Sequence, residues 1–102
     1  MPTLLVVDDD ADQLSVRAMV LRREGYTVLE SSDVAGALAH GAADLVVMDM
    51  IPGALSLIES IGSRAPIIVL TGRAVDGLPV ARVLRKPCRS RVLLDIIAEL
   101  LA

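Results

Sequence analysis

Residues 4–10 read LLVVDDD, so a fully apolar run passes directly into three carboxylates. A second apolar run at residues 45–48, LVVM, ends in Asp49 in the same way. Short apolar runs separated by helical patterns are typical of parallel strands joined by crossover helices. If the two runs are neighbouring strands, their carboxylates collect at one edge of one sheet. The pattern therefore predicts an α/β fold with an acidic cluster at the carboxyl ends of its strands.

Two later apolar runs end in other polar groups. Residues 67–70, IIVL, precede Thr71, and the run at residues 80–84 precedes Arg85, Lys86 and Pro87. Clustered carboxylates repel one another, and a hard divalent cation usually neutralises them. A metal, a nucleophilic carboxylate, a hydroxyl and a lysine together describe a site that accepts a phosphoryl group.

The composition bounds the class of protein. A chain of 102 residues is near the common size for one hydrophobic core, and aliphatic residues must fill it because aromatic residues make up only 1%. No apolar run reaches the ~20 residues of a membrane span, and residues 1–7 do not form a signal peptide. The single cysteine, Cys88, excludes an intramolecular disulfide and fits a reducing cytosol. A net charge of −3 argues against direct nucleic-acid binding, so a stand-alone cytoplasmic module is expected.

The periodicity of apolar residues predicts five strands and four helices. The strands are expected at residues 4–7, 26–30, 44–48, 67–70 and 80–84. The helices are expected to run up to about Glu24, from a cap at Ser32 or Asp33 to about Ala39, over residues 54–61, and onward from Ser90. Asp10 or Asp12 should cap the first helix, and Ser90 the last. The last helix should face inward with Val92, Leu93, Ile96, Ile97, Leu100 and Leu101. Residues 72–79 contain two glycines and a proline and are shorter than the average helix of about 11 residues, so the helix expected there is short or missing.

The chain resembles the receiver domain of two-component response regulators over essentially its whole length. The motifs LLVVDDD, LVVMDM, IIVLTG and LRKP carry this resemblance, in order, each at the end of an apolar strand. It implies one receiver domain at residues 1–102 with a flavodoxin-like doubly wound sheet of five parallel strands in the order 2-1-3-4-5. Its fourth helix would be short or missing.

The resemblance also implies a Mg²⁺ site. Asp8 and Asp9 match the acidic pair that holds the ion, with Asp9 as the direct ligand and Asp8 acting through water. Asp49 and the backbone carbonyl of Ile51 complete the set. One residue fewer than in the family separates Asp49 from Pro52, and this shortening is expected to displace the carbonyl.

The remaining site residues are implied in the same way. Asp49 matches the phosphoryl acceptor, Thr71 the hydroxyl that bonds the phosphoryl group, and Lys86 the lysine that pairs with its oxygens. Pro87 matches a cis-proline. The chemistry agrees, because a carboxylate can act as nucleophile and phosphoryl transfer mainly needs positioning and charge neutralisation.

Ordinary structural roles explain several other polar residues better than function does. Asp10 and Asp12 are helix-start acids, His40 is a surface residue, and Cys88 is a small buried filler. The basic residues Arg82, Arg85, Lys86, Arg89 and Arg91 form a solvated face, with docking of a partner as the alternative. Val83 stands where the family carries an aromatic switch residue.

Two functions stay open at this point. The leading one is a single-domain response regulator that takes a phosphoryl group from a histidine kinase or histidine phosphotransfer protein onto Asp49. It would signal through contacts with a downstream protein and turn over no separate product, so it is not expected to be an enzyme. The alternative is a pseudo-receiver that docks proteins without phosphorylation. Neither function involves a membrane, and apolar surface left by the missing helix on the fourth and fifth strands favours a weak homodimer.

Overall fold

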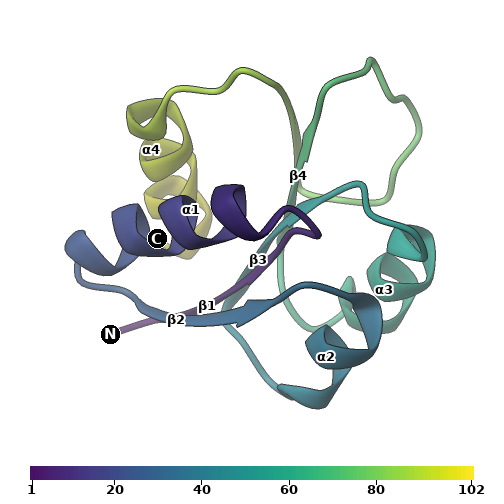
Figure 1. Ribbon diagram of the computed structural model, residues 1–102, viewed down its shortest axis with the longest axis horizontal. Helices are drawn as coiled ribbons and strands as arrows, with labels where there is room; N and C mark the ends of the chain where they lie inside the picture. Colours follow the sequence, from purple (N-terminus) through teal and green to yellow (C-terminus); the bar gives the residue numbers. More distant parts are fainter.

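The computed structural model describes all residues 1–102 and contains one sheet of five parallel strands with four helices (Figure 1). The strands are β1 (Thr3–Val7), β2 (Thr27–Ser31), β3 (Leu45–Asp49), β4 (Ile67–Thr71) and β5 (Arg82–Arg85). The helices are α1 (Ala11–Arg23), α2 (Val34–Ala39), α3 (Ala54–Ile61) and α4 (Ser90–Leu101). The strand order is β2-β1-β3-β4-β5, which confirms the predicted doubly wound, flavodoxin-like fold.

Two layers of helices cover the sheet, α1 and α4 on one face and α2 and α3 on the other (Figure 1). The strands supply both cores because successive side chains point to opposite faces. In β1, Leu4 and Val6 pack with α1 and α4, whereas Leu5 and Val7 pack with α2 and α3. Burial on both faces explains why the strands are uninterrupted apolar runs.

Side-chain caps set the starts of two helices. The Asp10 carboxylate accepts hydrogen bonds from the backbone N–H groups of Asp12 and Gln13, and Asp33 caps α2 through Gly36 N–H. The expected cap of the last helix is wrong. Ser90 is already the first residue of α4, and Arg89 occupies the N-cap position without a side-chain hydrogen bond.

The inward face of α4 also differs from the expectation by one position. Val92 is 45% exposed, whereas Leu94, which was not predicted to face inward, is buried beside Leu93 and Ile97. Adjacent Leu93 and Leu94 lie on either side of the line of contact with the sheet. This rotation turns Val92 toward solvent.

No helix forms between β4 and β5, as predicted, but the apolar surface expected on the fourth strand is not exposed. All of β4 is buried. Ile68 and Leu70 lie in the core cluster on the side of α1 and α4. Ile67 and Val69 lie in the cluster of α2 and α3, on which Leu78 and Val80 of the connecting segment also pack. Only Val83 of β5 presents a large apolar side chain there, at 36% exposure. Residues 72–80, which loop out beyond the end of β4 in Figure 1, therefore replace the missing helix in part. Among the helices, none is long and apolar enough to cross a membrane.

Candidate functional site

Three carboxylates meet at the carboxyl edge of the sheet. Asp8 and Asp9 follow β1 and Asp49 ends β3, the neighbouring strand. One carboxylate oxygen from each lies within 4.8 Å of the others. Asp8 is fully buried, Asp49 is half-buried and Asp9 is exposed. Ligands bind at this edge in open α/β sheets, so the cluster lies where a binding or catalytic site is expected.

Asp8 has two protein partners in the structure. One carboxylate oxygen accepts a hydrogen bond from the Asp10 backbone N–H at 2.9 Å. The other forms an ion pair of 2.9 Å with the guanidinium of Arg17, whose side chain is only 14% exposed. Arg17 was not expected at the site, because it lies in the middle of α1 and resembles an ordinary helix arginine in the sequence.

Asp49 is paired with Lys86. The Lys86 Nζ lies 3.0 Å from Asp49 Oδ1 and donates a hydrogen bond of 2.9 Å to the side-chain oxygen of Gln13 on α1. The Lys86–Pro87 peptide bond is cis, as predicted, and the Lys86 N–H donates to the Thr71 carbonyl at 2.8 Å. Gln13 is a further site neighbour that was not predicted, because it lies 73 residues from Lys86 in the chain.

Thr71 ends β4 beside Asp49, and its side-chain oxygen accepts a hydrogen bond of 3.1 Å from the Arg73 N–H. That bond uses a lone pair, so the hydroxyl proton remains available for donation. Asp49, Thr71 and Lys86 line one open cleft of about 550 Å³, together with Arg73 and other residues of the β4–β5 segment. The cleft is large enough to admit a donor group to Asp49.

The backbone carbonyl of Ile51, which the resemblance implies as a Mg²⁺ ligand, is engaged in a hydrogen bond within the protein. It accepts a hydrogen bond of 3.0 Å from the Ala54 N–H at the start of α3, and the Ile51 residue is buried. A carbonyl oxygen has two lone pairs, and this contact engages one of them. Ile51 thus remains a predicted ligand, whereas Asp8, Asp9 and Asp49 are gathered by the fold.

The donor set suits Mg²⁺, which prefers carboxylate oxygens and keeps several waters. Three carboxylates stand against two cations, Arg17 and Lys86, so the cluster carries one uncompensated negative charge. Asp9 has no ion-pair partner in the protein and faces solvent. The residues present therefore fit a hard divalent cation at the exposed side of the cluster.

The residues interpreted as structural lie away from the cluster or serve the helices. Asp10 and Asp12 begin α1, and exposed His40 ends α2 with a ring nitrogen 2.9 Å from the Glu30 carbonyl oxygen. Cys88 is only partly buried, against the core between α1 and α4, so its description as a buried filler is correct only in part.

Comparison with known proteins gives matches at the level of structure. No family model matches the sequence, and no curated protein matches it. A CheY-like response regulator receiver domain from Methanospirillum hungatei JF-1 is 26% identical with a TM-score of 0.89, covering 99% of this chain and 94% of that chain.

Two further solved structures agree. The response regulator TrrA from Thermotoga maritima, in complex with Mg²⁺-BeF, is 26% identical with a TM-score of 0.86, covering 99% of this chain and 100% of that chain. The receiver domain of the hybrid histidine kinase CckA is 29% identical with a TM-score of 0.78, covering 98% of this chain and 99% of that chain. In its strand order and in the carboxylates at the sheet edge, the chain is similar to CheY-like receiver domains of response regulators over nearly its whole length.

Proposed function

We propose that residues 1–102 act as one receiver domain that accepts a phosphoryl group on Asp49 from a histidine kinase or a histidine phosphotransfer protein. The observation that carries this proposal is the state of the Asp49 carboxylate. Lys86 pairs with Oδ1 at 3.0 Å, whereas no hydrogen bond or ion pair of the protein engages Oδ2. Asp49 also lines the open cleft with Thr71. A phosphoryl donor in this cleft can therefore approach a carboxylate that has one oxygen without a hydrogen bond.

The transfer follows from these positions. An Asp49 oxygen forms a bond to phosphorus while the phosphorus–nitrogen bond of the donor phosphohistidine breaks, and the leaving imidazole nitrogen takes up a proton from solvent. Lys86 neutralises charge on the phosphoryl oxygens, and the Thr71 hydroxyl donates a hydrogen bond to one of them. Gln13 holds Lys86 in place through its hydrogen bond of 2.9 Å.

Mg²⁺ is the proposed cofactor, with Asp8, Asp9 and Asp49 to hold it and the Ile51 carbonyl as a further predicted ligand. When bound, the ion would neutralise charge on the transferred group. Two observations support this assignment: carboxylate oxygens of the three aspartates lie within 4.8 Å of one another, and TrrA was crystallised with Mg²⁺-BeF.

The proposed output is a protein contact in the cytoplasm, with no separate product turned over and no direct contact with nucleic acid or membrane. Residues 72–79 take the place of a helix and lie next to Thr71, so we expect phosphorylation to order this segment. Amide hydrogen exchange with and without beryllofluoride measures the change. Identical exchange in both states would refute this form of output.

The test of the function is phosphorylation by a small-molecule donor such as phosphoramidate with Mg²⁺, followed by intact mass spectrometry. A single phosphoryl adduct is expected, and Asp49→Asn should abolish it. Asp76→Asn is the matched control, because Asp76 is an exposed aspartate in the neighbouring segment and should leave the adduct unchanged. An adduct that survives Asp49→Asn would contradict the assignment.

A phosphorylation-independent docking module is the second candidate. The observation that favours it is the pairing of Asp8 with Arg17 and of Asp49 with Lys86, which already compensates two of the three clustered carboxylates. A folded chain that yields no adduct and shows no NMR response to Mg²⁺ or beryllofluoride would establish this function instead.

A further inference from the structure

We infer that Arg17 is a built-in counter-ion of Asp8 that competes with Mg²⁺ for this carboxylate. The inference rests on the proposed function, because it concerns the same acidic cluster. It makes Arg17 a positioning residue that sets how tightly the site holds its metal.

The burial of Asp8 explains why the Asp8–Arg17 pair forms without metal. Asp8 is fully buried, and burying an ionised carboxylate costs free energy unless a cation and hydrogen bonds compensate its charge. Arg17 supplies that cation at 2.9 Å and stays charged at any relevant pH. The Asp10 N–H occupies the other oxygen, so both oxygens of Asp8 have protein partners.

The same pair opposes metal binding. A divalent ion at the cluster lies within a few ångströms of a fixed positive charge that it repels. At a separation of about 6 Å, even the full screening of water makes this repulsion worth a factor of about ten in affinity. Lys86 adds a second cation on the Asp49 side, but Asp49 is half-buried and its Oδ2 is unbonded. Arg17 is therefore the cation that most directly engages a buried member of the cluster.

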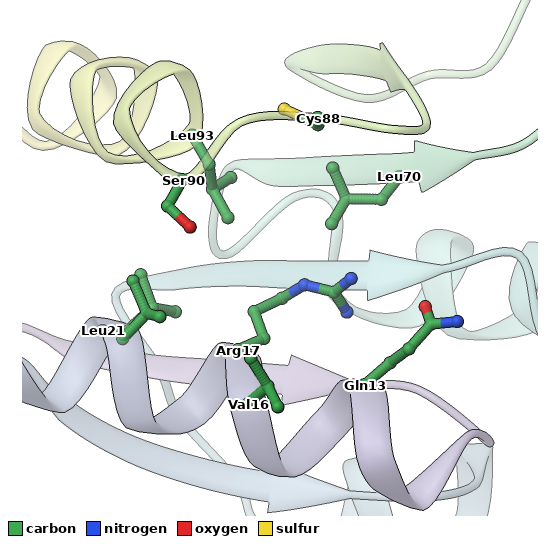
Figure 2. Close-up of a pocket in the computed structure, with 9 residues that line it drawn as sticks. Gln13, Val16, Arg17, Leu21, Leu70, Cys88, Ser90 and Leu93 are labelled. Carbon is green, nitrogen blue, oxygen red and sulfur yellow. The ribbon is translucent and has the colours of Figure 1, made fainter.

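A cavity beside Arg17 gives its side chain room to move away from Asp8. A cavity of about 170 Å³ lies between α1 and α4, and Arg17 and Gln13 line it from α1 opposite Leu70 and Cys88 (Figure 2). Ser90, at the start of α4, lines it as well (Figure 2). The oxygens of Gln13 and Ser90 can accept hydrogen bonds from a displaced guanidinium. Metal binding would then change the contacts between α1 and α4. This face of the sheet is the one that the missing helix between β4 and β5 does not affect.

The test is an NMR titration of the full chain with Mg²⁺, comparing wild type with Arg17→Met. Methionine keeps most of the aliphatic volume of arginine and removes its charge. We expect Arg17→Met to bind Mg²⁺ about ten times more tightly. Arg23→Met is the matched control, because it removes the same charge from an exposed position on α1 and should change affinity by less than about twofold. Equal or weaker binding by Arg17→Met would overturn the inference.

A second readout uses the wild-type chain, so it stands even if Arg17→Met fails to fold. The side-chain Nε–H resonance of Arg17 should shift on saturation with Mg²⁺ as the ion pair with Asp8 breaks. A wild-type chain that binds Mg²⁺ with this resonance unchanged would refute the inference and leave the proposed function intact. Absence of Mg²⁺ binding in wild type and Arg17→Met alike would refute both, whereas binding by Arg17→Met alone would support the inference.

Discussion

The segment between β4 and β5 should contribute measurable stability although it contains no helix. Leu78 and Val80 pack on the core cluster that α2 and α3 share with the sheet, and β4 beneath them is fully buried. Replacing Leu78 by alanine should therefore uncover part of that cluster and lower the free energy of unfolding.

The magnitude follows from the burial of Leu78. Leucine to alanine removes three carbons, each worth about 0.8 kcal/mol when fully buried. Because Leu78 is only partly buried, roughly half of that sum applies, so we expect a loss of about 1 kcal/mol. The cavity contribution should be small because the site opens to solvent. A fully buried neighbour such as Ile67 should instead cost about 2–5 kcal/mol on replacement by alanine.

Urea unfolding followed by far-UV circular dichroism is the suitable assay, because the chain has no tryptophan. Leu55→Ala is the control, since Leu55 lies on α3 at 56% exposure and its loss should change stability by less than about 0.5 kcal/mol. The reasoning would be refuted if Leu78→Ala were no more destabilising than Leu55→Ala. In that case the segment would not cover the sheet in solution.

Substitutions at four further positions test other parts of the structure by the same unfolding assay. Asp10→Ala should lose about 1 kcal/mol, because it removes the side-chain cap of α1, whereas Asp10→Ser should recover most of it. Gly53→Ala should lose at least about 1 kcal/mol, because Gly53 has φ +82° and an added Cβ would lie 3.2 Å from a neighbouring side chain. Gly72→Ala, where an added Cβ meets nothing within 4 Å, should be neutral, and a similar loss at both glycines would contradict this account. Glu99→Gln should change stability by less than about 0.5 kcal/mol, because the Arg82–Glu99 pair is exposed to solvent. A larger loss would show that this ion pair contributes more stability than an exposed pair normally does.

Much of the fold was predictable because its signals are local. Each apolar run ends at a carboxylate, a hydroxyl or a cation, and parallel strands bring such ends to one edge whatever the details of packing. The clustering of Asp8, Asp9 and Asp49 follows from the topology alone. The absence of a helix between β4 and β5 was equally visible, because the glycines and the proline leave too little chain for one.

The errors arose where tertiary contacts choose between similar local possibilities. Ser90 and Arg89 could each have occupied the N-cap position of α4, and in the structure Arg89 does so without a side-chain hydrogen bond. Val92 and Leu94 have similar apolarity, and the rotation of α4 on the sheet decides which of them is buried. Exposure of β4 was overestimated because Leu78 and Val80 cover it without regular secondary structure.

The sequence alone thus predicted the strands and the acidic edge, since periodicity and strand ends depend on neighbouring residues. The strand order and the roles expected in handling a phosphoryl group came from the resemblance that its motifs carry. Only the three-dimensional arrangement revealed that Arg17 pairs with Asp8 and that Gln13 holds Lys86. Arg17 and Arg22 lie on the same helix, yet the first meets a fully buried carboxylate and the second a partly exposed one. The physical reason is that the strength of an ion pair depends on burial, and burial is set by the packing of elements distant in the chain.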